Sequence, residues 1–426
     1  MTAYAIDFLS RASTLIDVDA SVMTRAKDWL LRQQNAEGAW PAPWTHDPHD
    51  MLMTTAYVAQ VVSQMPEDDK DRQKVQKVAI DKSLAYLAAQ RGLLDEPYVI
   101  ASYALAARAA GDETTAAELA DWLRTNAHFE SGAAYWVLER NSPFYGWGRA
   151  GRLESTAMAM RALGIFGKES DGALRKQGLL FLLRNTDREG MWYSGQTTVQ
   201  VLTAMLAIDA PGSDRAQQLH IRVNEKDVKT IALPGGRTVE PPIEIDVSEL
   251  VRSGENQMNL ELSGEGLVSG QLIAEWYVPW KDAVVLSSSA NSGSTLSYAV
   301  DYSKTTGTTN DKVQCRVHAE RIGHYGYGMM LGEVGLPPGA EVDRESLEHG
   351  VEASQSVHRY EVQPDRVILY FWAQAGGADF TFEFRPRFEM RAETAPSLLY
   401  DYYNPDSSVT LKPERFEVSA GSDSIH

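Results

Sequence analysis

The spacing of apolar residues changes once along this chain, and this change constrains the fold more than any other feature. Up to about residue 208, apolar residues recur every three or four positions, as on one face of a helix; Ile6, Leu9 and Leu15 are an example. Beyond about residue 215 they alternate with polar residues, which predicts strands. The sequence therefore predicts short helices stacked as a bundle or a ring of helical hairpins, followed by antiparallel β-sandwich structure.

Two stretches of the helical half repeat one another. "WLLRQQNAEGAW" ends at Trp40 and "FLLRNTDREGMW" ends at Trp192, and the two agree without a gap at six of twelve positions. In each we expect a helix to end, Gly38 or Gly190 to make a turn, and the tryptophan to fold back as an apolar plug. Two such corners, far apart in the sequence, are typical of a ring of helical hairpins. A chance likeness between two helix ends is the alternative.

The charge balance and the cysteine content exclude several functions. The formal net charge is −18, which disfavours nucleic acid and anionic membrane surfaces as partners. Cys315 is the only cysteine, so the chain has neither an intrachain disulfide nor a cysteine-rich metal site. Its segment alternates like a strand, which places His318 on the opposite face, and we therefore expect an inert, half-buried thiol.

Two polar segments, residues 209–217 and 281–293, interrupt the apolar patterns and mark domain boundaries. We expect a helical domain over residues 1–210. A small β domain over residues 216–280 and a terminal β-sandwich over residues 284–426 follow it.

Three motifs, in this order, resemble the C-terminal part of the α2-macroglobulin and complement superfamily. "MTAYAIDFLSRAS", with the helix end that leads to "EGAW", is similar to the family's thioester-containing domain. "SGQTTVQVLTAML" resembles a helix near the end of that domain, and "RVILYFWAQAG" with "LLYDYYNPD" resembles the receptor-binding macroglobulin domain. The resemblance covers essentially the whole chain. It implies a multidomain α + β protein in which an incomplete α/α toroid is followed by a partial CUB-like domain and a macroglobulin-like β-sandwich.

The chain also departs from that family. The family's thioester forms within a Cys-Gly-Glu-Gln-like motif, which this sequence lacks, and Cys315 falls in the wrong domain. In the family that motif, the first ring helices and a β segment that completes the small domain all precede the matched region. The resemblance therefore implies a C-terminal fragment of a bacterial-type, protease-trapping inhibitor, without bait region or thioester and with Met1 as an internal start.

The parent protein implied by the resemblance fixes the expected partners and location. It would trap proteases and would be extracellular or lie in the periplasm or cell envelope. The lack of a signal peptide in this chain is then expected, because the chain would be a C-terminal fragment. The segment would bind the missing N-terminal macroglobulin domains, and neither nucleic acid nor membrane. We expect it to hold no catalytic site, cofactor or metal ion, and so not to be an enzyme itself.

A histidine in the loop after the glycine turn relays the thioester's acyl group in the complement branch of the family. The matching loop here contains His46 and His49, of which His46 is the better match. A metal site formed by these histidines and Asp50 is one alternative, and a solvated polar loop is the other.

Aromatic side chains on the terminal domain protect the thioester from water in the intact family. The matching positions here are Tyr370 and either Tyr402 or Tyr403. The same residues could equally be core or sheet-face aromatics, for which tyrosine is common. A glycine-rich loop with Tyr325 and Tyr327 is a further candidate for the same contact.

An enzyme is the alternative from a different class. Helical rings followed by β-sandwiches also occur in polysaccharide lyases, and His128, Tyr135, Tyr145 and Arg149 would be the residues of such a cleft. A terpene cyclase would need an acidic cluster, but the acidic run "PEDDKD" lies in a polar linker. Glu154 is expected to help begin a helix rather than to act as a catalytic acid.

Overall fold

The computed structural model divides the chain into two compact units. One unit combines residues Met1–Met205 with Glu275–His426, and the other is Leu206–Ala274. The structure describes residues 1–41, 47–144, 146–164, 171–186, 190–207, 217–233, 243–263, 272–274, 277, 279–280, 295–322, 328–354, 356–372, 377–402 and 404–421.

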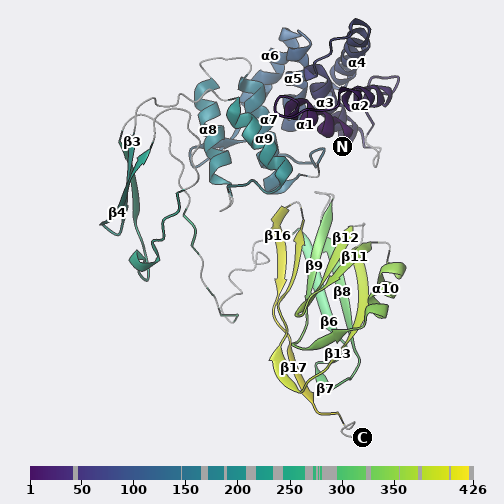
Figure 1. Ribbon diagram of the computed structural model, residues 1–426, viewed down its shortest axis with the longest axis vertical. Helices are drawn as coiled ribbons and strands as arrows, with labels where there is room; N and C mark the ends of the chain where they lie inside the picture. The colour runs from purple at the N-terminus through teal and green to yellow at the C-terminus, as the bar shows by residue number, and fades with distance from the viewer. Residues whose placement is uncertain are drawn as a thin grey trace. The chain divides into compact units, whose positions relative to one another are not determined.

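The N-terminal half of the first unit consists of helices that follow one another along the chain, purple to teal in Figure 1. The inner helices α3, α5 and α7 are buried nearly all round, and α5 packs between the other two. The outer helices α2, α4, α6 and α8 bury one side only, as amphipathic helices do. The elements are α1 (Thr2–Ala12), α2 (Ala20–Arg32), α3 (Pro48–Gln64), α4 (Lys70–Ala89), η1 (Arg91–Leu93), α5 (Pro97–Ala109), α6 (Glu113–Thr125), β1 (His128–Glu130), β2 (Ala133–Tyr135), α7 (Gly148–Gly164), α8 (Asp171–Arg184) and α9 (Gly195–Leu206).

Aspartate and proline residues fix where several of these helices begin. The side chains of Asp47, Asp69 and Asp112 each accept a hydrogen bond from a backbone N–H in the first turn of the following helix. Pro48 and Pro97 occupy first positions, where the missing N–H is not needed. The starts of the inner helices α3 and α5 and of the outer helices α4 and α6 are therefore fixed by local residues.

The second unit is a three-stranded antiparallel sheet in the order β4-β3-β5. Its strands are β3 (Gln217–Val223), β4 (Lys226–Leu233) and β5 (Met258–Ser263), with the short helix η2 (Ser248–Leu250) between β4 and β5. Leu219, Ile221 and Ile231 form a small buried cluster on one face of this sheet.

The C-terminal half of the first unit is a β-sandwich (Figure 1). One sheet has the order β10-β13-β8-β6, a second has the order β11-β12-β9-β15-β16, and a third, smaller sheet has the order β14-β17-β7. The elements are β6 (Leu296–Tyr302), β7 (Thr306–Thr308), β8 (Val313–Arg321), β9 (Met329–Gly335), β10 (Ala340–Val342), α10 (Arg344–Ala353), β11 (Val357–Val362), β12 (Arg366–Trp372), β13 (Ala378–Pro386), β14 (Met390–Glu393), β15 (Ser397–Asp401), β16 (Asn404–Leu411) and β17 (Arg415–Ser419).

Strict alternation along the strands builds the core of the sandwich. Phe380, Phe382 and Phe384 of β13 all point inward, and they share one buried cluster with Leu369 and Phe371 of β12. The predicted architecture, helical hairpins followed by antiparallel β domains, is thus confirmed.

Cys315 is more deeply buried than expected. The thiol is fully buried rather than half-buried, and burial raises its pKa well above the ordinary value. His318 points to the other face of β8, where it pairs with Asp379 at 2.9 Å. The expected placement of Cys315 and His318 on opposite faces of β8 is confirmed, and the inertness of the thiol stays a prediction.

Candidate functional site

Trp40 forms hydrogen bonds to both α2 and α3 in the connection between these helices, which we call a corner. The backbone N–H of Trp40 donates to Thr55 Oγ1 of α3 at 3.0 Å, and its indole N–H donates to the carbonyl of Leu30 in α2 at 2.8 Å. Gly38 makes the turn with a φ of +95°, and a Cβ there would lie 2.4 Å from the carbonyl oxygen of Lys82. Only glycine fits this position, since it tolerates both the positive φ and the close backbone.

The corner between α8 and α9 is built in the same way. The backbone N–H of Trp192 donates to Thr198 Oγ1 at 3.0 Å, and its indole N–H donates to the carbonyl of Leu182 at 2.7 Å. Gly190 again has a positive φ, of +75°. The repeated sequence therefore corresponds to a repeated set of hydrogen bonds between one helix and the next along the chain.

A third corner of this kind joins α6 to α7. Trp136 donates from its backbone N–H to Thr156 Oγ1 at 3.2 Å and from its indole to the carbonyl of Leu123 at 2.9 Å. Gly132 turns the β1–β2 hairpin with a φ of +80°. Sequence comparison missed this copy because the hairpin lengthens it: the indole reaches back 13 residues here and 10 residues at the other two corners.

Glu154 is a buried carboxyl on α7, directly beyond this third corner. The residue is 2% exposed, and its Oε1 accepts a hydrogen bond from Thr197 Oγ1 of α9 at 3.0 Å. Its Oε2 has no hydrogen-bond partner among the described residues. Burial raises the pKa of Glu154 to about 7, against the opposing effect of the Ser142 and Thr197 hydroxyls. The expectation that Glu154 begins a helix is wrong, because α7 begins at Gly148 and Glu154 lies beyond its first turn.

The loop before α7 packs against this carboxyl, and we refer to its described residues, 142–144 and 146–147, as the clasp loop. Ser142 Oγ accepts hydrogen bonds from the backbone N–H groups of Phe144 and Gly146, at 3.3 and 3.0 Å. The Phe144 ring makes edge-on contacts with Tyr4 of α1 and Tyr57 of α3, with centroids 5.5 and 5.1 Å apart. The loop is thus held by its own turn and by two helices.

Trp147, the last residue of the clasp loop, contacts the β-sandwich within the same compact unit. Its indole N–H donates to Asp401 Oδ2 at the end of β15, at 3.0 Å. Asp401 is fully buried and also accepts a hydrogen bond from Arg321 Nη1 of β8. The Arg321 guanidinium lies over the Trp147 ring at 5.6 Å and is itself 5% exposed. Because both charges are buried, each depends on the other for compensation.

Sequence reasoning singled out neither Trp147, Asp401 nor Arg321. A signal was present, because Asp401 takes the place of an apolar residue in an inward position of β15, in register with Ser397 and Leu399. A carboxylate at an inward position of a strand requires a buried partner. The sequence does not show which of its cations supplies that partner.

A second buried carboxyl belongs to Glu96, which precedes α5 directly and makes no side-chain capping hydrogen bond to it. It is 4% exposed and accepts a hydrogen bond from the backbone N–H of Glu139 at 3.2 Å. Burial raises its pKa to about 7, with further raising by Asp95 and Glu139 and opposition from the Glu139 N–H. Glu96 and Glu154 are therefore two buried acids that titrate in the same range.

Of the two histidines expected at a thioester relay, the structure describes only His49. His46 lies outside the described residues. His49 is the second residue of α3, and its Nδ1 lies 3.6 Å from Asp95 Oδ1, an ion pair when the imidazole is protonated. No group of His, Cys, Asp or Glu within the described ranges is arranged to hold a metal ion.

Of the three tyrosines expected to shield a thioester, the structure describes Tyr370 and Tyr402. Tyr370 lies on β12, where its hydroxyl donates to Glu361 Oε1 at 2.9 Å and the Arg359 guanidinium lies over its ring. Tyr402 follows Asp401 directly and is 49% exposed. Tyr403 lies outside the described residues, as do Tyr325 and Tyr327. The shielding role stays a prediction.

The residues of the alternative lyase cleft are brought together only in part. His128 and Tyr135 pair across the β1–β2 hairpin and stack, with centroids 5.6 Å apart. Arg149 instead donates to Asn185 Oδ1, just after α8, at 3.2 Å. Tyr145 lies outside the described residues.

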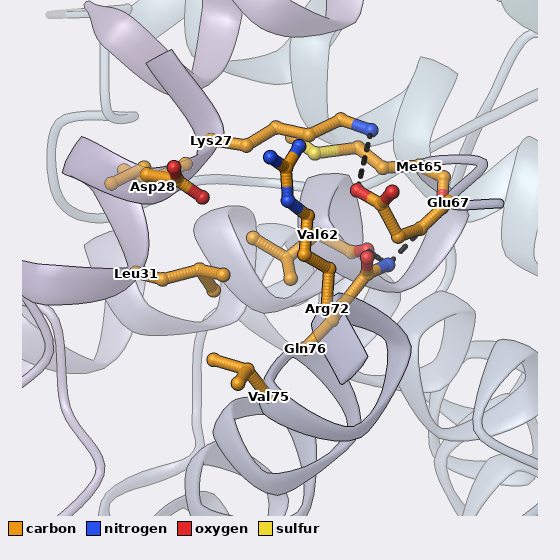
Figure 2. A pocket seen from close by; sticks show the side chains of 10 residues that line it. Lys27, Asp28, Leu31, Val62, Met65, Glu67, Arg72, Val75 and Gln76 are labelled. Carbon is orange, nitrogen blue, oxygen red and sulfur yellow. Dashed lines mark hydrogen bonds and ion pairs between the residues drawn. The ribbon is translucent and has the colours of Figure 1, made fainter. Parts of the chain in front are cut away.

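A pocket opens between α2, the end of α3 and α4, away from all of these residues (Figure 2). It holds about 450 Å³ of empty space, part of it open to solvent. A Lys27–Glu67 ion pair at 3.5 Å closes one side, and Gln76 Nε2 binds the carbonyl of Val62 at 2.7 Å. The lining residues are Lys27, Asp28, Leu30, Leu31, Val62, Met65, Glu67, Arg72, Val75 and Gln76.

No helix within the described part of the chain is both long enough and apolar enough to span a membrane.

Two family models match the sequence. Residues 1–207 match the A-macroglobulin TED domain, and residues 326–412 match the A-macroglobulin receptor binding domain. The first match covers the helical hairpins, and the second covers the strands that carry Tyr370 and Asp401.

Two curated relatives match over most of this chain. Complement C3 of Eptatretus burgeri is 22% identical over 400 residues, which are 87% of this chain and 23% of that protein. Thioester-containing protein 1 allele S1 of Anopheles gambiae is 23% identical over 422 residues, which are 95% of this chain and 29% of that protein. The chain therefore spans about a quarter of the length of these relatives.

Solved structures show the same fold. Native α2-macroglobulin from Escherichia coli, solved from domain MG7 to the C-terminus, aligns with a TM-score of 0.59 and 15% identity, over 98% of this chain and 62% of that chain. Salmonella α2-macroglobulin reacted with methylamine aligns with a TM-score of 0.57 and 16% identity, over 98% of this chain and 25% of that chain. The chain belongs to the α2-macroglobulin and complement superfamily, and it matches the C-terminal region of that superfamily's proteins.

Proposed function

We propose that this chain acts as the C-terminal part of a protease-trapping, α2-macroglobulin-like protein, and that it contributes to capture without forming a covalent bond. In this proposal residues 1–210 are the thioester-domain-like ring, residues 216–280 are part of a CUB-like domain, and residues 284–426 are the receptor-binding-like sandwich. Membership of the superfamily supports the trapping role. The state of the one thiol supports the non-covalent route.

The position of Cys315 supports capture without a covalent bond. An internal thioester needs a cysteine thiol and a glutamine side chain in one strained motif, and a usable nucleophile needs an accessible thiolate. Cys315 is the only cysteine, and it lies fully buried in the core of the sandwich with a raised pKa. Within residues 1–426, Cys315 is therefore unable to serve as a thioester cysteine, and these residues supply no other thiol for an acyl bond.

The same proposal assigns the partners and the location. Proteases would be bound through the larger protein, and N-terminal macroglobulin domains would be the other partners of residues 1–280. The protein would work outside the cytoplasm, extracellularly or in the periplasm or cell envelope. Tyr370 and Tyr402 or Tyr403 would then be the aromatic residues of the sandwich at the position where family members shield the thioester. The segment itself would carry no catalytic activity.

Trapping is tested on native protein recovered from source cells with an antibody raised against residues 284–426. The recovered protein is mixed with trypsin, and cleavage of a small peptide substrate is compared with cleavage of casein. A trapped protease keeps its activity on the small substrate and loses it on the large one, because only the large substrate is kept out. If both activities are unchanged, the trapping proposal is wrong.

The non-covalent route has its own readout. After the same reaction, denaturing electrophoresis is expected to release all of the trypsin from this chain. Intact-mass measurement after methylamine treatment is expected to show no added mass on residues 1–426. A trypsin–chain adduct that survives denaturation, or a methylamine adduct, would contradict this part while leaving trapping intact.

A further inference from the structure

The clasp loop connects a buried acid to the contact between the helices and the sandwich. Glu154 touches the loop on one side, since a Cβ at Gly146 would lie 2.8 Å from Glu154 Oε2. The next residue along the chain, Trp147, donates its indole N–H to Asp401 of the sandwich at 3.0 Å. The backbone therefore joins the two contacts through a single peptide bond, so that a shift of Gly146 moves Trp147 as well.

Two neutral hydroxyls, of Ser142 in the loop and Thr197 in α9, favour the ionised form of Glu154, but burial outweighs them and favours the neutral form. Thr197 Oγ1 contacts Oε1 at 3.0 Å, whereas Oε2 is buried and has no hydrogen-bond partner among the described residues. A neutral carboxyl tolerates one unpaired oxygen. An ionised carboxyl in the same place requires further donors, and water can supply them only if the packed loop moves away.

We propose that Glu154 is a pH-sensitive latch: its neutral form holds the clasp loop closed with Trp147 docked on Asp401, and its ionisation opens the loop and releases Trp147. This device is independent of the proposed function, because it requires only the contacts between α7, the clasp loop and β15. Its consequence is that the helices and the sandwich are held together more tightly in acid than in weak alkali.

The groups around Glu154 support the direction of this effect. From α5, the Tyr98 hydroxyl faces it; Tyr98 is fully buried, its pKa is raised by burial and by Glu154, and it contacts Gln200 of α9 at 3.3 Å. Thr197 of α9 and Ser142 of the loop face it with neutral hydroxyls. No Lys, Arg or His is among the groups that shift the pKa of Glu154. Arg161 of the same helix α7 acts instead on the tyrosines Tyr98 and Tyr57.

The test follows the Trp147 indole in 5-fluorotryptophan-labelled protein by fluorine NMR, with the signal assigned by its loss in W147F. Between about pH 5.5 and about pH 8.5, the Trp147 signal is expected to shift with a midpoint near 7. In Glu154→Gln, which keeps the shape of the neutral acid, the signal is expected to stay at its acid-side position at every pH. A Trp147 signal that still titrates in E154Q would overturn the proposal.

Glu96→Gln is the matched control, because Glu96 is a buried acid of the same domain with a pKa raised to the same range. Trp147 is expected to titrate normally in this variant. If E96Q abolishes the shift and E154Q does not, Glu154 is not the latch. A further variant, Thr197→Val, removes a hydroxyl that favours the ionised form, so the midpoint is expected to move to higher pH; an unmoved midpoint counts against the latch.

Hydrogen exchange of the unmodified protein tests the same idea if E154Q does not fold. The amides of Phe144 and Gly146, which donate to Ser142 Oγ, are expected to lose protection by roughly tenfold or more between pH 6 and pH 8, after correction for the intrinsic rate. The amide of Ala106 in α5 serves as the internal reference. Constant protection of the clasp loop across this range would also overturn the proposal.

Discussion

The indole N–H of Trp147 donates a hydrogen bond of 3.0 Å to the carboxylate of Asp401, a residue 254 positions further along the chain. Asp401 also binds Arg321, and the Arg321 guanidinium in turn lies over the Trp147 ring. The three side chains therefore form one closed set at the contact between α7 and the β-sandwich. Their burial makes this contact sensitive to the loss of any one member, because a charge left without its partner is costly.

Removal of the Asp401 carboxylate tests this set. Asp401→Ala leaves the Arg321 guanidinium buried without an anion, and we expect the free energy of unfolding to fall by about 3 kcal/mol. Urea denaturation measures the change. Asp81→Ala is the control, because Asp81 forms an exposed pair with Lys77 at 2.7 Å, and its loss is expected to cost less than about 1 kcal/mol. Equal effects of the two variants would show that the buried set contributes nothing special.

The third tryptophan corner gives a second prediction. Trp136→Phe removes the indole donor to the Leu123 carbonyl and leaves that buried oxygen without this bond, so we expect a loss of roughly 2 kcal/mol in the free energy of unfolding. Trp29→Phe is the control: it is the same substitution at a tryptophan that is 47% exposed, so its effect is expected to be smaller. Thermal unfolding of the two variants is compared, and a larger effect from W29F would contradict the role of the corner.

The two buried acids predict a dependence of stability on pH. Their pKa values rise from an ordinary 4.5 to about 7 on folding, so the folded state binds more protons between these values than the unfolded state does. Stability must then fall as pH rises through this window, by on the order of 3 kcal/mol for each acid, and level off above it. Denaturation midpoints at a series of pH values measure the slope. The double variant Glu96→Gln with Glu154→Gln should flatten it.

Two glycines of the helical region differ in what surrounds them. Gly146→Ala places a methyl group 2.8 Å from the Glu154 carboxylate, and we expect it to destabilise the fold by about 1 to 3 kcal/mol through overpacking. Gly172 lies in α8 with nothing within 4 Å of its Cβ position, so Gly172→Ala should be neutral or stabilise the helix by up to about 1 kcal/mol. Thermal shift measurements that rank the variants in the opposite order would refute this view of the clasp loop.

Much of the fold could be read from local patterns, because helices and strands impose their own periods on the sequence. The alternation of Phe380, Phe382 and Phe384 predicts a strand with an inward face, and the structure has that face in the core of the sandwich. The Gly38–Trp40 and Gly190–Trp192 repeat is likewise local. Both turns need a positive φ, and both tryptophans reach back by the same number of residues.

The tertiary structure alone decided the rest. Trp136 forms the same corner, but a hairpin inserted before it hides the repeat from any comparison of sequences. The partner of Asp401 could not be chosen among 40 lysines and arginines, since that choice depends on how β8 and β15 are placed in the sandwich. Glu154 has the sequence context of an ordinary helical residue, and only the packing of α7 against α9 and the clasp loop removes it from water. Periodicity is fixed by neighbours along the chain, whereas burial and charge pairing are fixed by neighbours in space.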